Sequence, residues 1–268
     1  MKKLLLGSVA LVALSFGTPA AFAADKRVPA YTPPPPPAPV YTWSGCYAGA
    51  SAGTSTGRSQ HFATAGSTFS NPAFANNQIP AGTPITEEFN VSGFIGGFQG
   101  GCNWQWGAWV FGIEGDGSAT NKSGQGPELP LAALNAPSAN WVSETQERWL
   151  VTARARLGWT IWDRTMVYVT GGGAWAKIDA SEWVFATNGT GPIRTGHQES
   201  NTRSGWTVGA GTEYAVGYGW SVKGEYLYVK FDDYTTFTTG PFAANSVSPR
   251  EVKLDDHIWR AGMNYRFW

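Results

Sequence analysis

The sequence predicts an all-β fold, an eight-stranded antiparallel up-and-down transmembrane β-barrel. Three observations support this prediction. From Trp43 onward, apolar residues alternate with small or polar residues at a period of two, and no sustained helical stripe interrupts them. The links between the alternating segments are long and short in turn. The chain also begins with an export signal, and only 14% of its residues are charged, against roughly 25% in a soluble globular domain.

The first 23 residues are predicted to be a signal peptide. Lys2 and Lys3 precede an apolar run over residues 4–16, and the small-x-small pattern of residues 21–23 follows. About 13 apolar residues are too few for a membrane-spanning helix. We therefore expect cleavage between Ala23 and Ala24 and export of the mature chain.

Residues 24–42 form a Pro-rich segment that we expect to lie in the periplasm. Seven prolines fall within residues 29–39, including the run 33–37. Such a run favours an extended polyproline II conformation without a core of its own. The segment is interpreted as a spacer, with a docking site for a partner as the alternative.

The predicted barrel domain covers residues 43–268 and contains eight alternating segments, each long enough to cross a bilayer as a tilted strand. They span residues 43–54, 88–103, 109–119, 143–159, 166–178, 202–214, 220–231 and 252–267. The first, third, fifth and seventh links (55–87, 120–142, 179–201 and 232–251) are long and rich in Gly, Pro, Asn, Ser and Thr. The other three, 104–108, 160–165 and 215–219, are short. This alternation places all long loops at one end of a meander.

The two faces of each strand differ in polarity. In the segment 143–159, one face carries Trp149, Val151, Leu157 and Trp159, while the other carries Arg154 and Arg156. An apolar face with an aromatic residue at each end suits a strand that contacts lipid. The same alternation in a water-soluble barrel would point the apolar face inward, and periodicity alone does not decide between them.

If the polar faces point inward, ionisable residues from several strands meet in the lumen. The predicted network consists of Glu114, Asp116, Arg154, Arg156, Arg203, Glu213, Lys223, Glu225, Arg260 and Arg266. Eight strands enclose a space just wide enough for side chains to fill. Two interpretations stay open at this stage, a structural plug of paired charges and an aqueous pore lined by them.

The two cysteines of an exported chain suggest a disulfide. Cys46 lies near the start of the first segment and Cys102 near the end of the second. Antiparallel pairing of these segments brings both residues to the end with the short turns. The alternative is two separate small residues that face lipid.

The sequence gives little support for catalysis or cofactor binding. It has three histidines, His61, His197 and His257, of which the first two fall in expected outside loops. It has no Gly-x-Ser-x-Gly elbow and no His/Cys spacing typical of a metal site. Because 19 basic residues balance 19 acidic residues, net charge favours no nucleic-acid partner. We therefore expect no enzyme, no cofactor and no metal site.

Seven motifs together resemble the small outer-membrane β-barrel family of alphaproteobacteria, whose members are described as outer membrane immunogenic or porin-family proteins. The motifs are residues 21–25 (AFAAD), 43–49 (WSGCYAG), 109–116 (WVFGIEGD), 154–158 (RARLG), 168–172 (YVTGG), 225–228 (EYLY) and 264–267 (NYRF).

The resemblance implies a barrel like the transmembrane domain of outer membrane protein A. It also implies assembly by the outer-membrane insertion machinery through a C-terminal aromatic signal. Chains of this family typically end on Phe, whereas here Trp268 follows Phe267. Because Phe267 is in phase with Tyr265, these two residues are the expected signal. Outer-membrane lipid and lipopolysaccharide are the other expected partners, and the sequence leaves the oligomeric state open.

The favoured function is a non-enzymatic structural and surface-antigen barrel of the bacterial outer membrane. Its long loops are expected to be extracellular and both termini periplasmic. The alternative is a small porin that passes ions or small polar solutes. A third hypothesis is adhesion or ligand capture by the outside loops, since the first loop contains Phe62, Phe69, Phe74 and Asn76-Asn77.

Overall fold

A computed structural model describes residues 41–69, 80–128, 139–187, 192–236 and 247–267 of the chain. The chain divides into two units, Met1–Pro39 and Val40–Trp268, and every described residue belongs to the second. The expected signal peptide and the prolines of the N-terminal segment lie outside the described residues.

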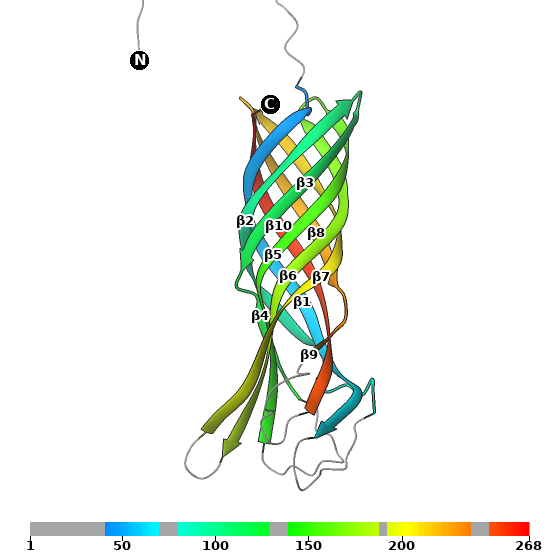
Figure 1. Cartoon of the computed structure of the whole chain (residues 1–268). Helices are drawn as coiled ribbons and strands as arrows, with labels where there is room; N and C mark the ends of the chain where they lie inside the picture. Colours follow the sequence, from blue (N-terminus) through cyan, green and yellow to red (C-terminus); the bar gives the residue numbers. More distant parts are fainter. Residues whose placement is uncertain (1–40, 70–79, 129–138, 188–191, 237–246, 268) are drawn as a thin grey trace, which may run out of the picture. The chain divides into compact units, whose positions relative to one another are not determined.

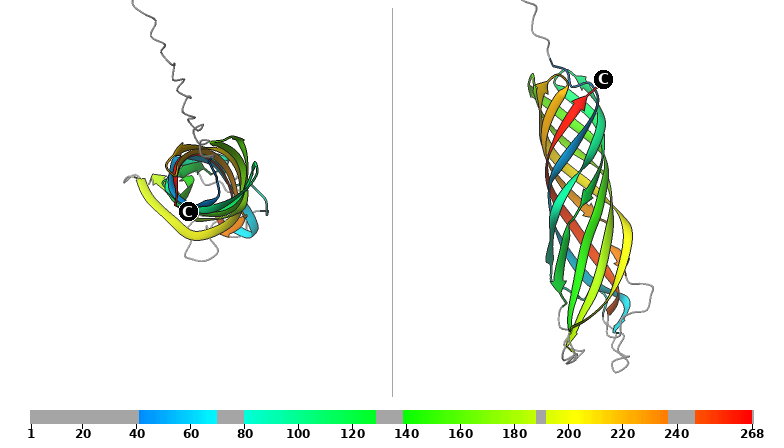
Figure 2. Two further views of the ribbon diagram at one scale, coloured as in Figure 1. Left: turned by 90° about the horizontal axis from the view of Figure 1, so that it is seen from above. Right: turned by 90° about the vertical axis from the view of Figure 1, so that its left-hand side faces the viewer.

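Eight long strands form a closed ring (Figures 1 and 2). They are β1 (Gly45–Phe69), β2 (Phe89–Trp106), β3 (Trp109–Thr120), β5 (Ala139–Trp162), β6 (Thr165–Thr187), β7 (Pro192–Gly217), β8 (Trp220–Phe231) and β10 (Val247–Arg266). Each strand pairs antiparallel with its neighbours in the chain, and the pairing of β1 with β10 closes the ring. The predicted eight-stranded up-and-down barrel is confirmed.

The strands are longer than predicted. β1 continues to Phe69 and β7 begins at Pro192, so parts of the expected long loops are strand. Two short strands, β4 (Ser123–Pro127) and β9 (Tyr234–Thr236), also lie in those links. The alternating pattern weakens there because outward residues no longer need to be apolar, whereas backbone pairing continues along the ladder.

Three short turns connect the strands at the end of the barrel where the last strand finishes (Figure 1). Gly107 in the β2–β3 turn has a φ of 60°. In the β7–β8 turn, Tyr218 has a φ of 53° and Gly219 one of 83°. Positive φ is readily adopted by glycine, which explains why glycine recurs in these turns. We call this the turn end of the barrel.

The outward face of the wall is apolar along the middle of the barrel, whereas the inward face carries both polar and apolar layers. Exposed aromatic residues form one girdle near the turn end, made of Trp104, Trp106, Trp109, Trp159, Trp220 and Tyr265, and a second girdle farther along, made of Phe94, Trp175, Trp206 and Trp259. Beyond the second girdle, outward residues such as Arg58, Arg148 and Lys230 are charged. The described residues include no helix long and apolar enough to cross a membrane.

Two apolar layers lie inside the barrel. The first, at the turn end, contains Trp43, Val110, Met166, Tyr168 and Ala215. The second, farther along the same strands, includes Ile95, Leu150, Leu227, Ile258 and Leu254. Trp43 was predicted to begin the first strand, but β1 begins at Gly45 and the Trp43 side chain is buried in the first layer.

Candidate functional site

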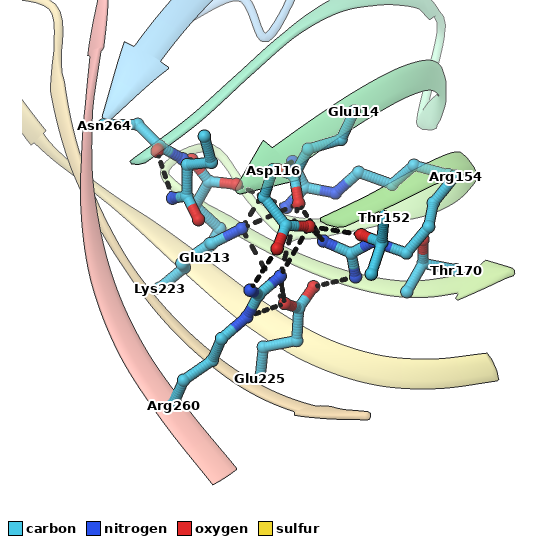
Figure 3. Close-up of polar contacts among 12 residues, drawn as sticks. Glu114, Asp116, Thr152, Arg154, Thr170, Glu213, Lys223, Glu225, Arg260 and Asn264 are labelled. Atoms are coloured by element: carbon cyan, nitrogen blue, oxygen red, sulfur yellow. Dashed lines mark hydrogen bonds and ion pairs between the residues drawn. The ribbon is translucent and has the colours of Figure 1, made fainter. Parts of the chain in front are cut away.

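A cluster of buried charges fills the lumen between the two apolar layers (Figure 3). Arg154 on β5 is the centre of this lumen network. Its Nη2 donates to Glu114 Oε1 at 2.5 Å and to Asp116 Oδ2 at 3.0 Å, and its Nη1 donates to Glu225 Oε1 at 3.1 Å. One guanidinium therefore joins carboxylates from β3 and β8 across the barrel.

Two further cations complete this part of the network. Arg260 on β10 donates through Nε to Glu225 Oε2 at 2.7 Å and through Nη1 to Asp116 Oδ1 at 2.8 Å. Lys223 Nζ lies 2.9 Å and 3.0 Å from the two carboxylate oxygens of Glu114. Charge-assisted hydrogen bonds of this kind are stronger than neutral ones, so each carboxylate is held by at least two donors.

Arg156 extends the network toward the turn end. Its guanidinium pairs with Glu213 and stacks 3.6 Å from the centre of the Tyr168 ring. Its Nη1 also donates to the Tyr47 hydroxyl at 3.2 Å, and Tyr47 in turn donates to Glu114 Oε2 at 2.6 Å. Tyr47 thus links the Glu213 side of the network to the Glu114 side.

The ionisable side chains of the lumen network are almost completely buried. Four acids, Glu114, Asp116, Glu213 and Glu225, face four bases, Arg154, Arg156, Lys223 and Arg260. The exposed fraction of these eight side chains lies between 0% and 4%. Because so little of their surface is exposed, they form a packed layer across the lumen.

Two of the ten predicted network residues lie elsewhere. Arg203 stacks over the Tyr234 ring at 3.8 Å, and Arg266 lies over the Tyr41 ring at 4.5 Å. Arg266 lies opposite Tyr47 of the network in the β1–β10 register. The pKa of Tyr41 is raised, chiefly because burial penalises its ionised form, so Arg266 meets a neutral ring.

The prediction missed the neutral members of the site. Asn264 donates to Glu213 Oε1 at 2.9 Å, Ser221 donates to the same oxygen at 2.5 Å, and Gln99 donates to Asn264 Oδ1 at 2.6 Å. Their inward parity in the sequence is the same as that of the charged residues. A search for all polar side chains, rather than charged ones, would have found them.

A second charged cluster lies beyond the lumen network and was not predicted. Lys122 Nζ is 2.9 Å from Glu147 Oε2 and also pairs with Asp256. All three side chains are 0% exposed. On β10, Asp256 lies between Ile258 and Leu254 of the second apolar layer. Lys122 is therefore the shared partner of two buried carboxylates that lie among apolar side chains.

Cys46 and Cys102 form a disulfide between β1 and β2. They lie directly opposite each other in the register, with their Cα atoms 4.0 Å apart. The bridge fastens the first hairpin near the turn end, where Phe267 N donates to Cys46 O at 3.1 Å. Tyr265 and Phe267 are exposed on the outer wall at this same end, and β10 ends between them at Arg266.

The three histidines lie in strands rather than loops. His61 was expected in the first outside loop, but it is buried within β1 and contacts Thr145 Oγ1 at 3.3 Å. His197 lies in β7. His257 Nδ1 is 2.7 Å from the Tyr226 hydroxyl, and its Nε2 is 3.6 Å from Asp255.

An apolar outer wall with two aromatic girdles, around a lumen that contains polar side chains, is the architecture of a bacterial membrane barrel. A family model described as the outer membrane protein beta-barrel domain matches residues 8–267. This chain belongs to that family. The protein is therefore an integral outer-membrane β-barrel, as the resemblance implied.

Relatives of this outer-membrane barrel match along its whole length. The 31 kDa outer-membrane immunogenic protein of Brucella melitensis is 34% identical over 270 residues, which cover 100% of both chains. The 25 kDa outer-membrane immunogenic protein of the same organism is 27% identical and covers 99% of that protein. The crystal structure of OprG from Pseudomonas aeruginosa covers 84% of this chain and 96% of its own, with a TM-score of 0.50 and 12% identity, and shows the fold alone.

Proposed function

We propose that this protein is a non-enzymatic structural barrel of the outer membrane whose lumen is closed and whose long connections are presented at the cell surface as antigen. The packing of the lumen network carries the proposal. Its eight charged side chains are at most 4% exposed, which leaves no water-filled path at their level. This favours the plug interpretation over the porin interpretation.

The orientation of the barrel is part of this proposal. The short turns and the C-terminal end of β10 share one end, and short turns are periplasmic in barrels of this class. The long connections then face outward. The Brucella relatives carry names that call them immunogenic, which supports surface display here. The aromatic pair Tyr265 and Phe267 is proposed to be the contact with the barrel assembly machinery.

The first prediction concerns conductance. The purified protein, once shown to be folded by its heat-dependent gel shift, should give no single-channel steps in a planar lipid bilayer, because paired charges and two apolar layers fill its lumen. A conducting porin reconstituted in the same bilayers is the control. Defined and reproducible steps from the folded protein would overturn the closed-barrel proposal and favour the porin alternative.

The second prediction concerns orientation. A membrane-impermeant amine reagent added to intact cells should label Lys177, which lies beyond the second girdle on the outer wall of β6. Lys26, in the N-terminal segment, should be labelled only after the outer membrane is opened. Buried Lys122 and Lys223 should resist labelling until the protein unfolds. Labelling of Lys26 but not Lys177 on intact cells would reverse the proposed orientation.

A further inference from the structure

A polar groove of about 250 Å³ lies on the outer wall formed by β1, β10 and β8. Its lining contains three cations and three carboxylates, which are Arg58, Lys230, Lys253, Glu88, Asp233 and Asp255. The groove is directly beyond the second aromatic girdle, at the depth where lipid headgroups meet a membrane barrel. Its cations therefore lie where membrane phosphate groups lie.

The strand register shows how polarity changes along this wall. Successive outward rows across β1, β10 and β8 are Ala52–Ala261–Gly224, Thr54–Trp259–Tyr226, Thr56–His257–Tyr228 and Arg58–Asp255–Lys230. With increasing distance from the turn end, the rows change from small residues to aromatic residues and then to charged residues. This order matches the order of acyl chain, interface and headgroup in a lipid.

The rings of four residues form a continuous surface beside the polar groove, which we call the aromatic shelf. They are Tyr226, Tyr228, His257 and Trp259. The Tyr226 and Trp259 rings lie 4.6 Å apart, and the Tyr228 and His257 rings 5.3 Å apart, measured between ring centres. The Tyr226 hydroxyl and His257 Nδ1, 2.7 Å apart, join the two rows. Each of these rings offers an apolar face and a polar edge, which suits contact with a sugar.

The charges of the groove are available to a ligand. Arg58 is paired with Glu88 at 3.1 Å, and Lys253 with Glu251 at 3.3 Å and Asp233 at 3.8 Å. These five side chains are between 35% and 61% exposed. Exposed ion pairs of this kind contribute little stability, so a phosphate can displace the carboxylates. The carboxylates then remain as acceptors for hydroxyl groups. A headgroup with both phosphate and hydroxyls satisfies both sets.

An apolar groove of about 1020 Å³ extends across the outer wall from β1, β10 and β8 through β7, β6 and β5 to β3, and its lining includes Ala52, Ala261, Gly224, Trp259 and Tyr226. Because no side chain larger than alanine projects from its Ala52–Ala261–Gly224 row, an acyl chain can lie flat against the wall there. The polar groove above and the apolar groove below share the aromatic shelf as their common border.

We propose that this face of the barrel binds a phosphorylated glycolipid of the outer leaflet. The phosphate lies among Arg58, Lys230 and Lys253, the sugar contacts the aromatic shelf, and an acyl chain occupies the apolar groove. The choice of the outer leaflet rests on the orientation given under the proposed function.

Native mass spectrometry of the full protein, extracted from membranes in detergent, tests the proposal. The probes are a phosphorylated lipid A glycolipid, its dephosphorylated form, phosphatidylethanolamine and inorganic phosphate. We expect the phosphorylated glycolipid to bind most tightly. The triple variant Arg58→Gln, Lys230→Gln, Lys253→Gln should bind it about tenfold or more weakly, because charge-assisted hydrogen bonds to phosphate are lost.

The matched control is Arg148→Gln with Lys177→Gln, which removes two outward cations beyond the girdle on the β5–β6 wall. This control should bind the glycolipid as the unchanged protein does. Equal loss in the control would indicate general attraction of anionic lipid and overturn the site. So would retained binding in the triple variant, equal binding of the dephosphorylated lipid, tighter binding of phosphatidylethanolamine, or binding of inorganic phosphate without preference for the lipid.

The binding result is separable from the proposed function. Binding in detergent depends neither on the closure of the lumen nor on the orientation of the barrel in cells. Conductance and lysine labelling of the same protein test those two points. A conducting or inverted barrel that binds the glycolipid would therefore overturn the proposed function alone.

Discussion

Replacing Arg154 with methionine should lower the free energy of unfolding by about 3 to 5 kcal/mol, the usual effect of removing one partner from a buried ion pair. The variant leaves Glu114, Asp116 and Glu225 buried without the guanidinium that they share. The heat-dependent gel shift and urea unfolding in lipid vesicles measure the change. Methionine keeps most of the side-chain volume, so the loss reports charge rather than a cavity.

Arg58→Met provides the control for this experiment. Arg58 is 61% exposed and pairs with Glu88, which is 53% exposed. An exposed ion pair contributes about 0 to 1 kcal/mol. Equal destabilisation by the two substitutions would mean that the lumen network does not hold the barrel together.

Lys122→Met should also destabilise the barrel by about 3 to 5 kcal/mol. The substitution leaves Glu147 and Asp256 facing each other inside the second apolar layer, with no cation between them. Burying two unpaired carboxylates is costly in an environment of low dielectric constant. Urea unfolding at neutral pH measures this effect.

A triple variant separates charge from packing at this cluster. Adding Glu147→Gln and Asp256→Asn to Lys122→Met removes the uncompensated charges and preserves the shapes of the side chains. Most of the lost stability should return. If the triple variant is no more stable than Lys122→Met, the single substitution acts through packing. Lys177→Met, on the outer wall of β6, should have little effect.

The sequence predicted the ring of strands and most of the lumen network because both follow from strict alternation. A strand that separates lipid from a polar interior must alternate, so Arg154 and Arg156 are assigned to the inside by counting alone. Pairing Cys46 with Cys102 needed only the antiparallel register of the first hairpin.

The Lys122 cluster was not predicted because the strict alternation of inward and outward residues is interrupted there. The β5–β6 register shifts between Glu147 and Trp149, with Arg148 as the additional residue. Strict alternation from Trp149 assigns Glu147 to the outside, and the bulge turns it inward. Lys122 lies between β3 and β4, in a link that sequence alone describes as a polar loop.

The ring closes where β1 pairs with β10, so the barrel can close only late in the synthesis of the chain. The two strands come from opposite ends of the barrel domain, so the seam cannot form until the ribosome has released nearly the whole chain. Until then, both strands present unpaired backbone groups, which promote aggregation. The chain must therefore reach the membrane unfolded and protected, and a product truncated before β10 would be recognisable to proteases by its two open edges.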